Sequence, residues 1–136
     1  MQKRFLIFGG ISGAIAVALG AMGAHFLKSK IETGLITELN LKTFETATRY
    51  QMYHSIILIV IALLSEKINY RLLSKSAYCF IIGIFCFSGS LYLISTAGLI
   101  GITNINWLGP ITPIGGLFFI GGWLLLAFSS IRNSKN

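Results

Sequence analysis

Four long apolar runs dominate this sequence, and each is long enough to cross a lipid bilayer. They cover residues 5–27, 44–64, 76–97 and 113–131 of the 136-residue chain. The hydrocarbon core of a bilayer is about 30 Å thick, and about 20 helical residues span it at a rise of about 1.5 Å each. Only 11% of the residues are charged, which is too few for the large surface of a small soluble domain. We predict an all-α membrane protein: a single integral domain over residues 1–136, built as a bundle of four transmembrane helices.

The connections between the runs differ in character. Residues 28–43 mix Lys, Glu and Thr with scattered Ile and Leu, and we interpret them as a connecting segment that could lie at the interface as a short amphipathic helix. Residues 98–109 carry no charge, so we expect them to fold back on the bundle with Trp107 at the membrane interface. The first run could instead be a cleaved signal peptide. Its length and the three runs that follow favour a retained helix.

Lysine and arginine residues are divided unevenly between the two ends of the predicted helices. Seven lie on the side that carries both termini: Lys3, Arg4, Lys67, Arg71, Lys75, Arg132 and Lys135. Four lie on the opposite side: Lys28, Lys30, Lys42 and Arg49. Because positive residues are enriched on the cytoplasmic side of membrane proteins, we predict that both termini are cytoplasmic. No basic stripe accompanies the net charge of +7, so we expect no nucleic-acid partner.

Small residues follow one face of the first predicted helix and recur in the fourth. Lipid tails are as apolar as leucine, so membrane helices associate through close packing and interhelical hydrogen bonds. The glycines that we expect in such packing are Gly9, Gly13, Gly20, Gly115, Gly116 and Gly122. One interpretation is packing within a single copy of the chain. The other is an interface between copies in a homo-oligomer.

Polar residues occupy the half of the bundle away from the termini. Gln51 and His54 share one face of the second helix, and this face must contact protein because unpartnered polar groups are costly in hydrocarbon. The other helices bring polar side chains to a similar depth. The candidate cluster consists of His25, Tyr50, Gln51, His54, Ser88, Ser90 and Tyr92. For His54 we expect a hydrogen bond to another helix, from His25, Ser88, Ser90 or Tyr92. The cluster either only stabilises the bundle through interhelical hydrogen bonds or forms a functional site.

The residue types argue against several kinds of chemistry. Two histidines are too few for a closed zinc site, and no spacing typical of a haem or metal site accompanies them, so we expect no metal and no cofactor. A hydrolase needs a nucleophile, a base and an orienting group, and a pairing of Ser88 or Ser90 with His54 lacks the acidic third member. The chain has four acidic residues, all glutamates at or beyond the predicted helix ends, which weakens the case for coupled ion transport.

Four motifs, one for each predicted helix, carry a resemblance to a known family. They are GAMGAHFL at 20–27, FETATRYQMYH at 44–54, FSGSLY at 87–92, and GPITPIGG at 109–116 followed by GW at 122–123. In this order they cover the whole chain and resemble the YgdD/YwdK-like family of small bacterial inner-membrane proteins, domain of unknown function family 423. The resemblance implies a four-helix protein of the bacterial cytoplasmic membrane. It implies no activity and no catalytic residue.

These observations predict a non-enzymatic, multi-pass membrane protein that acts through a membrane lipid, a small molecule or a protein partner. The alternative is a small transporter or channel that uses the polar cluster. A water-filled cavity lined by Gln51 and His54 would favour transport. Glycine stripes left unpaired within one copy would favour a homo-oligomer or another membrane protein as the partner.

Overall fold

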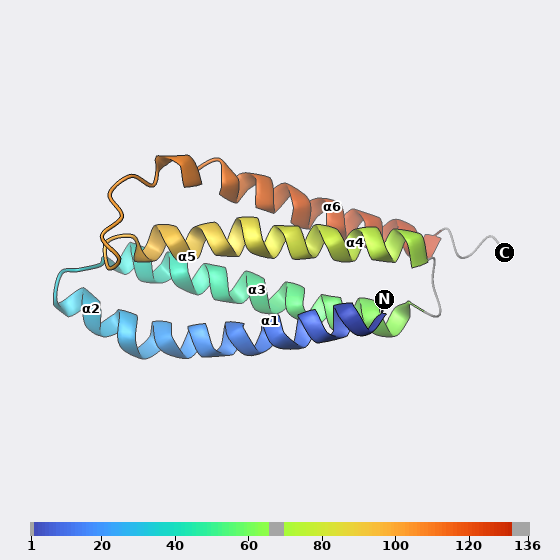
Figure 1. The fold of residues 1–136 in the computed structure, drawn as a ribbon, viewed down its shortest axis with the longest axis horizontal. Helices are drawn as coiled ribbons and strands as arrows, with labels where there is room; N and C mark the ends of the chain where they lie inside the picture. The colour runs from blue at the N-terminus through green and yellow to red at the C-terminus, as the bar shows by residue number, and fades with distance from the viewer. Residues whose placement is uncertain (1, 66–69, 132–136) are drawn as a thin grey trace.

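The computed structural model describes residues 2–65 and 70–131, and the regular elements in these ranges are all helices, with no strand. Four helical spans are long and apolar enough to cross a membrane: Lys3–Glu32, Glu38–Leu64, Tyr70–Thr96 and Asn106–Ile131. They lie side by side along the long axis of the molecule, and successive spans run in opposite directions (Figure 1). The predicted all-α fold with four membrane-spanning helices is confirmed.

Two of the spans are interrupted by π-helical turns. The first span joins α1 (Gln2–Met22), the π-helical turn η1 (Gly23–Leu27) and α2 (Lys28–Glu32). The second is α3 (Glu38–Leu64). The third joins α4 (Tyr70–Gly83), the π-helical turn η2 (Ile84–Ser88) and α5 (Gly89–Thr96), and we refer to it as the third span. The fourth begins with the 3-10 turn η3 (Asn106–Leu108) and continues as α6 (Ile111–Ile131).

The segment 28–43 is not a separate connection, and this prediction needs correction. Residues 28–32 continue the first helix and α3 begins at Glu38, so only residues 33–37 link the two spans. A capping box explains the early start of α3. The Asn40 N–H donates to the Thr37 hydroxyl at 3.2 Å, and the Thr37 N–H donates to Asn40 Oδ1 at 3.0 Å. These bonds satisfy amides at the helix start, so the helix extends beyond the apolar run.

The four spans form two antiparallel pairs. α1 packs along α3, and α6 packs along the third span. The second and third spans also pack on each other, which places α1 and α6 on opposite sides of this central contact (Figure 1). The largest buried cluster crosses the centre and includes Phe5, Leu58, Phe80 and Phe119.

Glycines bring the backbones of each pair close together. A Cβ atom added at Gly9 would lie 2.8 Å from the carbonyl oxygen of Ser55 on α3. A Cβ at Gly115 would overlap the backbone of Phe87 in the third span, and one at Gly122 would lie 2.6 Å from the ring of Phe80. These three glycines therefore belong to interfaces within one copy of the chain.

The other glycines of the packing prediction have more room. A Cβ at Gly13 would have its nearest neighbour at 3.7 Å and one at Gly116 at 3.9 Å, which are ordinary contacts. Gly20 has nothing within 4 Å, so it makes no close contact within one copy of the chain. The buried face of the first span explains this, because Gly20 lies beside it. That face follows Phe5, Gly9, Ser12, Ala16, Gly23 and Leu27.

The connection between the third and fourth spans folds back on the bundle in part. Leu108 is buried, and Leu99 packs against the cluster of Leu27, Ile36 and Phe44. Trp107 is 61% exposed, as expected for a ring that meets the membrane interface.

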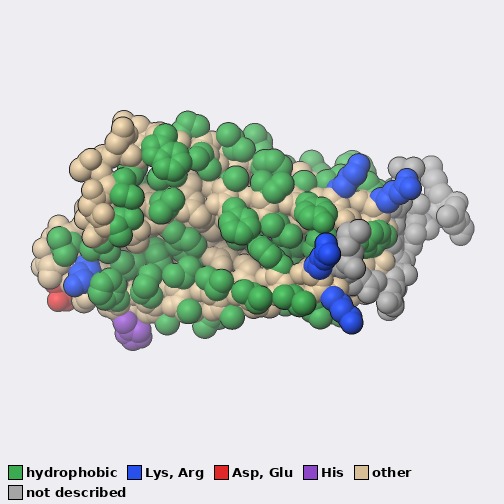
Figure 2. Space-filling model, in the orientation of Figure 1, with side chains coloured by type: hydrophobic (Ala, Val, Ile, Leu, Met, Phe, Trp, Pro, Cys, Tyr) green, Lys and Arg blue, Asp and Glu red, His purple; other side chains and the backbone are tan. Residues whose placement is uncertain are grey.

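The surface of the bundle suits a bilayer. Apolar side chains cover the middle of the face shown in Figure 2, and Lys and Arg side chains gather at the end where α1 begins. We call this the basic end; its described cations are Lys3, Arg4, Arg71 and Lys75. Lys67, Arg132 and Lys135, which also entered the topology prediction, lie outside the described residues.

Candidate functional site

Gln51 is the centre of a buried hydrogen-bond network that joins three spans. Its Nε2 atom donates to the Ser12 carbonyl oxygen of α1 at 2.9 Å, and its Oε1 atom accepts from the Tyr92 hydroxyl of α5 at 2.7 Å. The Ser55 hydroxyl lies 2.8 Å from that of Ser12 and 2.7 Å from the Gln51 carbonyl oxygen. Gln51 is 5% exposed, so this network satisfies a polar side chain that would otherwise be costly in the membrane.

Sequence reasoning missed Ser12 and Ser55 in this network. Both are small residues close to helix faces that are expected to contact protein: Ser12 lies between Gly9 and Ala16 on α1, and Ser55 is one turn after Gln51 on α3. A serine on such a face was a signal, because interhelical interfaces in membranes are enriched in small hydroxyl side chains.

His54 belongs to a different contact, on the side of α6. Its Nε2 atom accepts a hydrogen bond from Trp123 Nε1 at 3.3 Å, and its Nδ1 atom lies 2.7 Å from the Tyr50 carbonyl oxygen. Because an indole N–H can only donate, Nε2 must be the acceptor and Nδ1 carries the proton, as in a neutral imidazole. The ring also stacks on Phe119, with centroids 3.5 Å apart and planes 2° from parallel.

The expected bond from His54 to another helix is present, but its partner is none of the four candidates. The reason is the position of His54 along the axis of the bundle. α3 begins at Glu38 and ends at Leu64, so His54 is about 15 Å from the end of α3 at the basic end. It therefore lies in the half of the bundle nearer the termini. α6 runs antiparallel to the third span and brings Trp123 to this depth, whereas His25 is exposed near the other end.

The remaining candidates are not brought together. The Ser90 hydroxyl pairs with Thr112 at 2.6 Å. The Ser88 hydroxyl is fully buried and has no hydrogen-bond partner among the described residues. Tyr50 is 41% exposed and packs its ring on Phe87, with centroids 4.7 Å apart. The seven predicted residues thus form several small contacts and no single cluster.

Two grooves open between spans that do not pack tightly. The first, which we call the α1 groove, lies between α1 and the third span and has a volume of about 530 Å³. Its lining residues are Arg4, Ile7, Phe8, Ile11, Ser12, Ile15, Leu19, Gln51, Ile84, Phe85, Gly89 and Tyr92. The polar members Ser12, Gln51 and Tyr92 bond to one another. The groove therefore presents a mostly apolar surface with one charged side chain, Arg4.

The second groove, the α6 groove, lies between α3 and α6 and has a volume of about 730 Å³. Aromatic rings and aliphatic side chains line it, and His54 and Trp123 meet at its wall. Gln51 and His54 thus line different grooves. Across residues 2–65 and 70–131, no three His, Cys, Asp or Glu side chains converge as metal ligands would.

The comparisons with known proteins agree with this architecture. A family model described as "Protein of unknown function (DUF423)" matches residues 19–116. The UPF0382 membrane protein YwdK of Bacillus subtilis is 37% identical over 96% of this chain and 98% of its own length. UPF0382 membrane proteins of Staphylococcus haemolyticus and Staphylococcus epidermidis are 37% and 38% identical over the same shares. No solved structure matches the chain. The chain is therefore a membrane protein that belongs to the DUF423 family, a family of unknown function.

Proposed function

We propose that this protein is a non-enzymatic lipid-binding protein of the bacterial cytoplasmic membrane, and that an acyl chain of a membrane lipid lies in the α1 groove. The observation that carries the proposal is the groove itself. Arg4 and Leu19 mark its extent along α1, and fifteen residues of helix correspond to about 22 Å. This is longer than half of the roughly 30 Å hydrocarbon core, so the groove can take the chain of a lipid from one leaflet.

The character of the groove favours an acyl chain over water. Ile, Leu and Phe side chains form most of its lining. The side-chain amide of Gln51, which also lines it, is already hydrogen-bonded to Ser12 and Tyr92. A water molecule needs two to four polar partners, and the bonded groups offer few. An acyl chain needs none.

The same contacts weaken the two alternatives. A transporter pathway lined by both Gln51 and His54 is not supported, because these side chains line separate grooves and bond to other residues. A homo-oligomer built on the glycine stripes is also less supported, because Gly9, Gly115 and Gly122 meet neighbours within one copy.

We propose cytoplasmic termini from the distribution of charge. In the sequence, seven Lys and Arg residues lie beside the span ends on the side of the termini and four lie beside the opposite ends, and such residues are enriched on the cytoplasmic side of membrane proteins. A cysteine placed by Asn104→Cys, after replacement of Cys79 and Cys86, tests this orientation. We expect an impermeant maleimide to label it from outside intact cells. Labelling only after the cells are opened would contradict the proposal.

Lipid binding is tested by filling the groove. Gly89 lines the α1 groove, and a Cβ added there meets nothing within 4 Å, so Gly89→Phe places a ring in the groove without disturbing a packed interface. Gly10→Phe is the matched control, because Gly10 has equally open surroundings and lines neither groove.

The measurement is native mass spectrometry of the protein in mild detergent, titrated with phosphatidylglycerol and phosphatidylcholine of identical acyl chains. We expect Gly89→Phe to weaken the binding of both lipids by about tenfold, or about 1.4 kcal/mol, and Gly10→Phe to bind like the wild-type protein. Equal binding by Gly89→Phe and the wild-type protein would refute the proposed site.

A further inference from the structure

The charge at one end of the α1 groove carries a further assignment, which rests on the proposed function. We infer that the groove selects phospholipids with an anionic head group, and that Arg4 on α1 and Lys75 on the third span bind the head-group phosphate. The proposed function requires only a chain in the groove. This inference names the class of lipid and the residues that distinguish it.

Arg4 occupies the mouth of the groove at the basic end. It is the one charged side chain among the residues that line the groove, and it is exposed. Along α1 it shares a face with Phe8, Ile11 and Ile15, because the spacings of four, three and four residues follow one side of a helix. Its guanidinium therefore continues an apolar stripe toward the level of the lipid head groups, where long basic side chains extend from helix ends.

Lys75 is an exposed cation of the third span at the same end of the bundle, beyond the residues that line the groove. The ring of Phe5 packs edge-on against Tyr78 with centroids 5.5 Å apart, and that of Phe8 lies 6.0 Å from that of Phe85. These two contacts set α1 and the third span in register, with both helices starting at the basic end. Lys75 is three residues before Tyr78, which places it on the same helix face one turn nearer that end. Arg4 directly precedes Phe5, so Arg4 and Lys75 lie at a similar level along the bundle axis, at the basic end of the groove.

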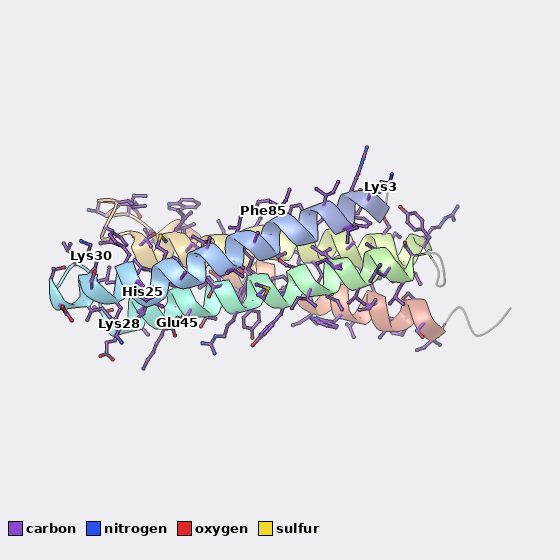
Figure 3. All side chains as sticks on the ribbon, turned by 90° about the horizontal axis from the view of Figure 1, so that it is seen from below. Lys3, His25, Lys28, Lys30, Glu45 and Phe85 are labelled. Atoms are coloured by element: carbon purple, nitrogen blue, oxygen red, sulfur yellow. The ribbon has the colours of Figure 1, made fainter. Side chains whose placement is uncertain are left out.

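The described carboxylates do not compete for these cations. Glu32, Glu38 and Glu45 lie toward the other end of the bundle, and Figure 3 shows Glu45 and Lys3 far apart along its axis. The remaining glutamate, Glu66, lies outside the described residues. Within the described ranges, Arg4 and Lys75 therefore have positive charge available for an anion.

An anionic phospholipid matches the apolar groove and the cations together. The groove accommodates a chain, and guanidinium and ammonium groups form charge-assisted hydrogen bonds with phosphate oxygens. A net negative head group gains from both cations. A zwitterionic head group carries its own positive charge, which opposes them. Free inorganic phosphate could meet the cations but would leave the groove without an occupant.

The test measures head-group selectivity in the full-length protein. The dissociation constants of phosphatidylglycerol and phosphatidylcholine with identical chains are compared for the wild type, Arg4→Gln, Lys75→Gln and the double variant. Lys28→Gln is the control, because Lys28 is an exposed cation at the other end of the bundle (Figure 3). A basic residue near anionic lipid contributes about fivefold in affinity. We expect the preference for phosphatidylglycerol to fall about fivefold in each single variant and about 25-fold in the double variant.

Binding of phosphatidylcholine should weaken less than that of phosphatidylglycerol in these variants, and its persistence shows that the groove remains folded. If the wild-type protein binds both lipids equally while Gly89→Phe weakens both, the proposed function stands and the head-group assignment is wrong. If neither lipid binds the wild-type protein, the proposed function fails with it. Selectivity that survives in the double variant would place the anion site elsewhere. Displacement of phosphatidylglycerol by millimolar inorganic phosphate would show that the groove contributes nothing.

Discussion

Replacing Gly115 with alanine should force α6 away from the third span. The added Cβ would lie 2.8 Å from the Cα atom of Phe87, and backbone cannot rotate aside as a flexible side chain can. The backbone N atom of Phe87 would lie closer still, so the helices must separate by more than about 0.6 Å to reach the 3.4 Å at which ordinary Cβ contacts begin. A gap of about 0.5–1 Å forfeits about a quarter to a half of each dispersion contact along the interface. Overpacking of this kind costs about 1–3 kcal/mol.

Gly116→Ala is the matched control one position along the same helix. Its Cβ would have its nearest neighbour at 3.9 Å, an ordinary contact. Both variants gain up to about 1 kcal/mol from the better helix propensity of alanine, so their difference isolates the steric effect.

Equilibrium unfolding in mixed detergent and dodecyl sulfate micelles measures this difference. We expect Gly115→Ala to be about 1–3 kcal/mol less stable than Gly116→Ala. Equal stability of the two variants would show that α6 and the third span do not pack as closely as described.

The remaining predictions concern polar contacts and use the same unfolding assay. Gln51→Leu should cost about 1–3 kcal/mol, because it leaves the partly buried Tyr92 hydroxyl and the buried Ser12 carbonyl without their partner; an unchanged stability would contradict the network. Trp123→Phe should cost about 1 kcal/mol by removing the donor to His54, and a stability equal to that of the wild type would show that this 3.3 Å bond contributes little. Thr37→Ala should cost about 1 kcal/mol and accelerate hydrogen exchange in the first turn of α3, with no effect on α6.

Hydropathy is sufficient to predict the four spans, because the thickness of the hydrocarbon core fixes how many apolar residues a crossing needs. It does not predict where the helices end. α3 begins at Glu38 because the Thr37 and Asn40 side chains satisfy its first amides, and these polar residues look like a loop on a hydropathy scale. The apolar run marks the part of the helix in hydrocarbon, and capping decides the rest.

Periodicity predicts which face of a helix is buried but not what lies opposite. Gln51 and His54 are both buried, as their shared face indicates. Their partners, Ser12 and Trp123, depend on the relative depth of neighbouring helices, which the pattern within one helix does not contain. The π-helical turn η2 adds to the difficulty, because its wider turn rotates the residues that follow relative to a regular α-helix.

Repeated glycines predict close packing, but the structure shows that the side chain opposite each glycine matters as much. Gly83 was not among the predicted packing residues, yet an added Cβ there would overlap the ring of Phe119. Gly20 belongs to a repeating pattern and faces open space. Whether a glycine is needed depends on the bulky partner that it accommodates, and this partner is distant in sequence.

The pairing of the spans has a consequence for biosynthesis. Each tight pair joins spans that are consecutive in the chain, α1 with α3 and the third span with α6. Membrane helices insert first and associate afterwards, and contacts between neighbouring segments form faster than distant ones. The first pair can therefore close, with Gln51 already bonded to Ser12, while the ribosome is still translating the second. The Tyr92 hydroxyl then donates its hydrogen bond to Gln51 Oε1 when the later pair packs beside the first pair in the bilayer.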